Sequence, residues 1–208
     1  MLEVNMKKCR TLCLLVLAMI CLLAGCGGLD DVKETTISIS SKGAVTEAII
    51  GSAEKKSYSA EELQSFVEDD IKTYNENAKS ENIKLKSCEI KDKVSRIEIT
   101  YASYTDYAAY HRTTLYYGTL KEAEGAGYDF DVDFIDNNGE AAAKSTILSN
   151  DNDWKVVILE EPVDVMVSGD ILYVSNNAEI SAKREVKIAE AGEAKTITTD
   201  SLVYLIYK

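Results

Sequence analysis

Few side chains of this chain belong to the types that perform enzyme chemistry. His111 is the only histidine, which excludes multi-histidine zinc sites and leaves a single residue around which a catalytic triad could form. The chain contains no nucleophile elbow, no phosphate-binding glycine loop and no dinucleotide-binding glycine motif. Ser52-Ala53-Glu54-Lys55 matches the S-x-x-K pattern of serine nucleophiles, but the companion K-T-G triplet is absent. We therefore assign no catalytic residue.

Carboxylates are numerous, with 35 Asp and Glu against 23 Lys and Arg and a net charge of −12. Asp129, Asp131 and Asp133 have the spacing of calcium ligands, but Phe134 stands where a calcium loop needs glycine. Alternate residues of a strand also point along one face instead of converging. Two further acidic segments are typical of turns, namely 136–139 and 150–153. We expect no metal and no cofactor, and the acidity excludes nucleic acid as the main partner.

Tyrosine dominates the aromatic residues, with twelve Tyr against three Phe and one Trp. Tyr104, Tyr107 and Tyr110 recur every three residues after Tyr101. Because a step of three residues drifts around a helix, some of these rings must be exposed. An exposed tyrosine offers apolar area and a hydroxyl to a glycan, a peptide or a protein. We therefore name Tyr104, Tyr107 and Tyr110 as candidate ligand-binding residues; the alternative is that they pack a helix onto a sheet.

The first 26 residues indicate where the protein is located. Lys7, Lys8 and Arg10 precede an apolar run from Leu12 to Ala24, which is 13 residues long. At about 1.5 Å per residue this run is too short to cross a hydrocarbon core of about 30 Å. It has the length and the basic flank of a signal-peptide core.

The tetrad Leu23-Ala24-Gly25-Cys26 that follows resembles the lipobox of bacterial lipoproteins, and the resemblance covers residues 6–26 only. It implies cleavage after residue 25, a lipid on the Cys26 sulfur with fatty acyl chains such as palmitate, and a position on the extracytoplasmic face of the cell membrane. The alternative is an uncleaved helical anchor. Without residues 1–25 the net charge is −14, because they carry three basic residues and one acidic residue. Attachment therefore depends on acyl chains and not on a basic surface.

Cysteine usage agrees with this interpretation. Of the five cysteines, only Cys88 would remain without a lipid after cleavage, so no internal disulfide can form. We interpret Cys88 as a buried, unreactive thiol, because a reactive one would need a basic neighbourhood.

Local patterns predict the elements that position these residues. Two hairpins are expected, one over 36–40 and 45–50 and one over 83–90 and 94–101. A helix over 59–79 begins at a capping box of Ser59 and Glu62. Its expected apolar face is Leu63, Phe66, Val67, Ile71, Tyr74 and Ala78. Shorter helices are expected from Ser103 through Tyr110 and from the Thr119 capping box to about Gly125, with a strand over 113–117 between them.

Alternating aromatic and acidic residues predict a further strand over 128–134. Six short strands are expected beyond it, over 154–159, 163–167, 170–174, 178–181, 185–188 and 202–207. The pattern predicts an α+β fold: antiparallel hairpins, one long amphipathic helix and short helices, followed by a β-rich C-terminal part. The expected divisions are a signal peptide (1–25), a short membrane-proximal linker (26–34), an α+β part (35–136) and a β-rich part (137–208). Charge does not separate the last two parts, so a single merged domain stays open.

These observations favour a lipid-anchored, non-catalytic binding or interaction module at the cell envelope. Its expected partners are the membrane, through Cys26, and an envelope protein or polysaccharide. Two alternatives stay open. One is a hydrolase of envelope glycans that uses paired carboxylates. The other is a structural subunit that braces an envelope complex.

Overall fold

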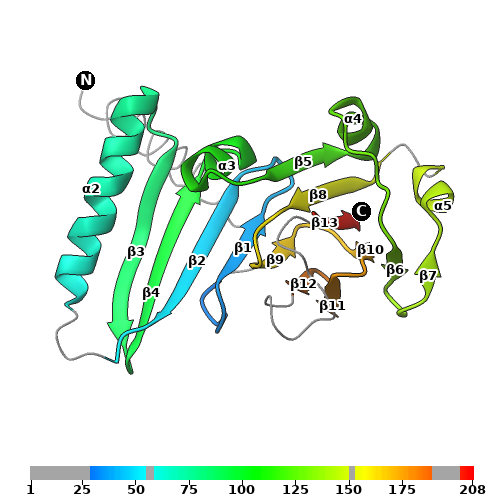
Figure 1. Cartoon of the computed structure of the whole chain (residues 1–208). Coiled ribbons are helices and arrows are strands. Elements are labelled where there is room, and N and C mark those ends of the chain that lie inside the picture. Colours follow the sequence, from blue (N-terminus) through cyan, green and yellow to red (C-terminus); the bar gives the residue numbers. More distant parts are fainter. Residues whose placement is uncertain (1–28, 55–58, 150–152, 189–201) are drawn as a thin grey trace, which may run out of the picture.

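The chain folds into two β-sheets with helices packed on their faces and at their ends (Figure 1). The computed structural model describes residues 29–54, 59–149, 153–188 and 202–208. The predicted signal peptide and Cys26, with its lipid, lie outside the described residues. The α+β fold class is confirmed, including the long helix and the β-rich C-terminal part.

The first sheet has seven strands in the order β11-β12-β9-β1-β2-β4-β3. They are β1 (Thr36–Ile39), β2 (Val45–Ser52), β3 (Ile83–Lys91), β4 (Val94–Tyr101), β9 (Asp164–Val167), β11 (Ala178–Ala182) and β12 (Glu185–Ile188). Both predicted hairpins are confirmed as the antiparallel pairs β1–β2 and β3–β4. Asp92 and Lys93 form the second turn with positive φ angles of 50° and 66°, as a two-residue hairpin requires. Among the described strands, only β1 and β9 pair in parallel.

The second sheet has six strands in the order β5-β8-β13-β10-β6-β7. They are β5 (Leu115–Thr119), β6 (Phe134–Asp136), β7 (Ala141–Ala142), β8 (Lys155–Leu159), β10 (Ile171–Ser175) and β13 (Val203–Tyr207). The C-terminal strands lie within a residue or two of their predicted positions. β5 begins two residues later than expected, and the two-residue strand β7 was not predicted.

The described helices are α2 (Ala60–Ala78), α3 (Tyr104–His111), α4 (Leu120–Gly125) and α5 (Lys144–Leu148). The Ser59 hydroxyl accepts the N–H of Glu62 at 3.3 Å at the start of α2. The capping box of Thr119 and Glu122 is complete at the start of α4. Helix α5 was not predicted, and its N-cap, Ala143, has no side chain that could cap it. Within the described part of the chain, no helix combines the length and the apolar character needed to span a bilayer.

The predicted apolar face of α2 is only partly correct. Four of its residues are buried or packed against the core: Leu63, Val67, Ile71 and Tyr74. Phe66 instead has 72% of its surface exposed, and Ala78 is also exposed. Because neighbouring helix positions lie about 100° apart, Phe66 falls outside the narrow stripe that is centred on Val67 and Ile71.

The predicted strand over 128–134 is wrong, and only its last residue, Phe134, enters a strand. Phe130 has a φ of 54°, in the left-handed region, and the Asp129 carboxylate accepts the N–H of Asp131 at 3.0 Å. These are features of a turn, which Asp favours because its side chain can bond to a nearby backbone N–H. Phe130 and Phe134 are nevertheless both buried. The alternating pattern therefore marks a buried side of this segment, but the segment is a loop.

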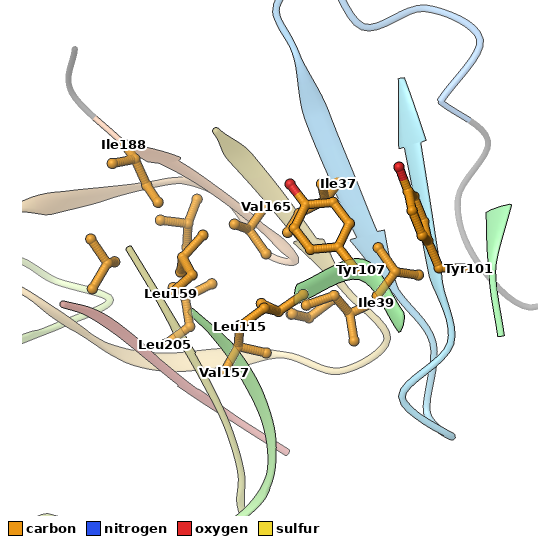
Figure 2. Close-up of a cluster of buried hydrophobic side chains, with 14 of the residues drawn as sticks. Ile37, Ile39, Tyr101, Tyr107, Leu115, Val157, Leu159, Val165, Ile188 and Leu205 are labelled. Atoms are coloured by element: carbon orange, nitrogen blue, oxygen red, sulfur yellow. The ribbon is translucent and has the colours of Figure 1, made fainter. Parts of the chain in front are cut away.

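Two hydrophobic clusters lie on opposite faces of the second sheet. In β8, Val157 and Leu159 pack with residues of the first sheet, whereas Val156 and Ile158 pack with α4, α5 and the 128–134 loop. Figure 2 shows part of the cluster shared by the two sheets. The rings of Tyr101 and Tyr107 stand in it beside aliphatic side chains, with both hydroxyl oxygens on the same side of the view (Figure 2).

Both sheets contain strands from each side of residue 136. β1 pairs with β9, and β5 pairs with β8, so the predicted α+β and β-rich parts share both sheets and both hydrophobic clusters. The turn at Ser168-Gly169-Asp170 carries the chain from β9 in the first sheet to β10 in the second. A Cβ at Gly169 would lie 2.3 Å from the carbonyl oxygen of Lys208, so this close approach requires glycine.

The described part of the predicted linker packs against the folded domain. Leu29 is 2% exposed, and Arg96 in β4 donates from Nη1 to the carbonyl oxygen of Val32 at 3.0 Å. Residues 29 and 32 are therefore in contact with the rest of the domain, close in sequence to the predicted lipidated residue, Cys26.

The exposure of α2 side chains yields a test of this packing. Ile71 is 6% exposed, so Ile71→Ala is expected to lower the free energy of unfolding by about 2–4 kcal/mol. Phe66→Ala removes a larger side chain from an exposed position and should change it by less than about 0.5 kcal/mol. Urea denaturation followed by circular dichroism measures both. A larger loss for Phe66→Ala than for Ile71→Ala would contradict the observed orientation of the helix.

Candidate functional site

Helix α3 stands at the junction of the two sheets and carries all three tyrosines singled out from the sequence. Its N-cap is Ser103, whose hydroxyl accepts the N–H of Asp106 at 3.2 Å. It ends at Arg112, which adopts a left-handed conformation with a φ of 57°. The helix connects β4 of the first sheet to β5 of the second. Its side chains are therefore in a position to contact both sheets.

Three side chains of α3 end on carboxylates from three different elements. The Tyr107 hydroxyl donates to Glu161 at 2.6 Å, the Tyr110 hydroxyl donates to Asp70 at 2.5 Å, and His111 Nε2 lies 3.1 Å from Glu47. Glu161 belongs to the connection between β8 and β9, Asp70 to α2 and Glu47 to β2. These contacts connect α3 to the β8–β9 connection, to α2 and to β2.

Glu47 lies on the apolar face of the first sheet. Its cross-strand neighbours are Ile37 and Ile99, and Glu47 itself is only 3% exposed. Its Oε2 accepts a hydrogen bond from the Tyr101 hydroxyl at 2.7 Å and contacts His111. A carboxylate buried among aliphatic side chains is costly unless such partners compensate it. The Glu47, Tyr101 and His111 side chains, which we call the buried triad, therefore form one polar unit inside the core.

The surroundings raise the pKa values of His111, Tyr101 and the neighbouring Tyr107. Burial lowers the pKa of His111, but the hydrogen bond and charge of Glu47, with the charge of Glu161, outweigh it and raise the pKa above its usual value. Burial, followed by the charge of Glu47, raises the pKa of Tyr101 and of Tyr107 far above that of a free phenol. Both phenols therefore stay protonated and act as hydrogen-bond donors.

A second group of rings lies around the outer strand of the second sheet. Tyr104 of α3 contacts Tyr116 and Tyr117 of β5 with centroid separations of 5.8 and 6.1 Å, and Tyr116 contacts Tyr128 at 5.0 Å. All four rings are partly exposed, and we call Tyr104, Tyr116, Tyr117 and Tyr128 the tyrosine row. Neighbouring residues of a strand point to opposite faces, so Tyr104 reaches both β5 rings across the strand's edge.

The tyrosine row is supported by close backbone and cation contacts. A Cβ at Gly43 would lie 2.7 Å from the Tyr117 ring, and Gly43 has a φ of 79°, so this turn requires glycine. The Tyr117 hydroxyl donates to the carbonyl oxygen of Ser41 at 2.8 Å. The Lys155 ammonium lies 5.8 Å from the centroid of the same ring. The β1–β2 turn thereby holds one end of the row in place.

The structure separates the three candidate tyrosines. Tyr107 is 1% exposed and belongs to the core, and Tyr110 is half-buried against Tyr74 and Tyr101. Only Tyr104 joins the row. Sequence reasoning did not include Tyr116, Tyr117 and Tyr128 in the site. The first two lie close to the tyrosine run in sequence, but no local signal indicates that the loop carrying Tyr128 folds beside them.

The sequence also suggested Cys88, the S-x-x-K pattern and the acidic segments as candidates for chemistry. Cys88 is half-buried, and burial followed by the charge of Glu68 raises the pKa of its thiol, which disfavours the reactive thiolate. Lys55 of the S-x-x-K pattern and most of the 150–153 segment lie outside the described residues. Within the described ranges, no three His, Cys, Asp or Glu side chains are grouped so that they could hold a metal ion.

A groove of about 850 Å³ lies between α2 and the outer strand β3 of the first sheet. Ile71, Ile83 and Leu85 contribute apolar surface to it, and Lys and Glu side chains of α2 line it as well. The groove contains neither the tyrosine row nor the buried triad.

Comparisons of the chain with protein-family models, with curated proteins and with solved structures found no match.

The hydrogen bond of Tyr107 yields a stability test. Tyr107→Phe keeps the ring but leaves the half-buried Glu161 carboxylate without this donor, so the free energy of unfolding should fall by about 1–2 kcal/mol. Tyr104→Phe is the matched control, because the Tyr104 hydroxyl has no hydrogen-bond partner in the described part of the chain. Its expected change is below about 0.5 kcal/mol. Equal losses in urea denaturation would contradict the structural role of the Tyr107 hydroxyl.

Proposed function

We propose that this protein is a lipid-anchored, non-catalytic binding module on the extracytoplasmic face of a bacterial membrane, with the tyrosine row as its binding surface. The observation that carries the proposal is the contact of four partly exposed tyrosine rings from α3, β5 and the loop after α4. The expected ligand is an envelope polysaccharide or the surface of an envelope protein.

The geometry of the row suits binding. Tyrosine has few rotatable bonds, so it provides large amphipathic contact area at a low cost in conformational entropy. The rings of the row also restrain one another, and the Tyr117 hydroxyl is bonded to the backbone of Ser41. A ligand therefore meets a surface that is already ordered, which lowers the cost of binding.

The carboxylates around α3 favour a structural role over a catalytic one. Glu47, Asp70 and Glu161 each accept a hydrogen bond from a tyrosine hydroxyl, and Glu47 is 3% exposed. A general acid or base must come within hydrogen-bond reach of a substrate, and these contacts occupy the carboxylates. The occupied carboxylates support the binding module over the glycan hydrolase that the sequence left open.

The N-terminal contacts support a position close to the membrane. Leu29 is buried, so only two residues separate it from the proposed lipidated Cys26. Three Cα–Cα steps span at most about 11 Å. The folded domain would thus lie almost directly on the bilayer surface, held by acyl chains at about 0.8 kcal/mol per buried CH₂.

Lipidation is tested on the native product. Mass spectrometry of the N-terminal peptide from the membrane fraction should show Cys26 as the first residue, carrying a diacylglyceryl group. Cys26→Ser should stop both modification and processing, because no thiol is present to accept the lipid. An unmodified Cys26 thiol in the wild-type protein, or recovery of that protein from the cytosol, would contradict the proposed anchor.

Ligand binding is tested with soluble peptidoglycan fragments, measured by isothermal titration calorimetry. Tyr104→Ala and Tyr116→Ala should each lower the affinity at least tenfold, since each removes a ring that contacts the ligand. Tyr173→Ala is the matched control, because Tyr173 is a partly exposed ring that packs on Trp154 outside the row. The affinity of the Tyr173→Ala variant for the fragments should stay within about twofold of the wild-type affinity.

The same samples distinguish binding from hydrolysis. The fragments should be recovered intact after prolonged incubation, as judged by mass spectrometry. Cleaved products that disappear when one carboxylate is changed to an amide would favour the hydrolase instead. An equal loss of affinity in all three tyrosine variants would remove the tyrosine row as the binding surface.

A further inference from the structure

The buried triad contains one group whose charge changes near neutral pH. Glu47 is 3% exposed between Ile37 and Ile99, and His111 is the only basic side chain in contact with it among the described residues. His111 is the last residue of α3, whereas Glu47 lies in the middle of β2. The contact between them therefore joins the helix to the sheet.

We propose that the Glu47–His111 contact is a pH-sensitive latch, which fastens α3 to the first sheet when His111 is protonated and weakens when His111 loses its proton. A protonated imidazole gives the buried carboxylate a compensating charge. A neutral imidazole removes this compensating charge and leaves Glu47 with the uncharged hydrogen bond that the Tyr101 hydroxyl donates. The latch goes beyond the proposed binding function and does not depend on it.

Several other groups face His111 and determine its behaviour. The Tyr101 hydroxyl of β4 lies 2.9 Å from Nε2, and the rings of Tyr107 and Tyr110 pack against the imidazole at 4.4 and 5.1 Å between centroids.

Charged groups also lie around His111. Glu161, in the β8–β9 connection, adds negative charge. Asp70 of α2 acts through its bond to Tyr110. Arg112, the following residue, is exposed. The hydrogen bond and charge of Glu47 and the charge of Glu161 therefore favour the charged imidazole and outweigh the burial that disfavours it.

The sign of the pH dependence follows from the raised pKa of His111. A group whose pKa is higher in the folded state contributes its full stabilisation below its unfolded pKa, about 6.5, and loses it as the pH rises through the folded value. The latch is therefore closed below about pH 6.5 and loosens as the pH rises through the raised pKa of His111. Over this range Tyr101 and Tyr107 stay protonated, because their pKa values are raised well beyond it.

Loosening of the latch has a consequence for the tyrosine row. Tyr104 is the first residue of α3 and His111 is the last, so we expect movement of this eight-residue helix at His111 to displace Tyr104 as well. A rise in pH through the raised pKa of His111 should then weaken binding at the row. This consequence rests on the proposed function, whereas the latch does not.

A single histidine makes the test direct, because the imidazole signals in an NMR spectrum of the full chain belong to His111 alone. The titration midpoint of the wild-type protein is expected above about 6.5. Glu47→Gln should lower the midpoint, since the imidazole stays partly buried but loses the charge beside it. Glu160→Gln is the matched control: this neighbouring carboxylate accepts the Thr114 hydroxyl and is exposed, so the midpoint should not move.

Folding of the variants is checked by circular dichroism. Should Glu47→Gln not fold, Glu161→Gln takes its place and should lower the midpoint by a smaller amount, because Glu161 acts on His111 through charge. A wild-type midpoint at or below about 6.5 would overturn the latch. A midpoint that neither variant lowers would overturn it as well. Because the titration needs no ligand, its outcome is independent of whether the tyrosine row binds anything.

A second measurement follows the contribution of His111 to the stability of the fold as the pH changes. The ratio of the folding constants of wild type and His111→Gln, obtained from urea denaturation, should decrease between pH 6 and pH 9. The expected decrease is about tenfold for each unit by which folding raises the pKa of His111. A ratio that is constant over this range, or that rises, would show that protonation of His111 does not hold α3 in place.

Discussion

Strand β13 is buried along its whole length, and its alternate side chains enter two different hydrophobic clusters. Val203, Leu205 and Tyr207 face the first sheet, and Tyr204 and Ile206 face α4, α5 and the 128–134 loop. The second sheet can be buried on both faces only if segments from both halves of the chain cover it. Strand β13 therefore contributes side chains to both hydrophobic clusters and joins them across the second sheet.

The same packing requirement explains the polar groups inside the molecule. Helix α3 fills the junction of the two sheets, where its rings are buried but their hydroxyls and imidazole still need partners. Carboxylates from β2, α2 and the β8–β9 connection supply them. Directional bonds of this kind allow one position of the helix on an otherwise apolar surface. Rings that do not enter the junction extend onto the outer strand β5 and form the tyrosine row.

Local elements were predictable because their signals lie within a few residues of one another. Caps at Ser59, Ser103 and Thr119 mark the starts of three helices, and turn residues mark both hairpins. The errors have an equally local origin. Alternation over 128–134 is shared by strands and by loops with one buried side, and Phe66 lies just outside the stripe that packing selects.

The sequence by itself determined the α+β composition and gave rise to two expectations, a lipid at Cys26 and no internal disulfide after cleavage, since each depends on residue types and short spacings. Only the tertiary structure decided which tyrosines are buried and which are exposed, because that depends on the pairing of β1 with β9 and of β5 with β8 across more than 35 residues. It also placed Glu47 beside His111. A carboxylate in an apolar strand gives no local indication of its partner, because the imidazole that compensates its charge comes from a helix 64 residues away in sequence.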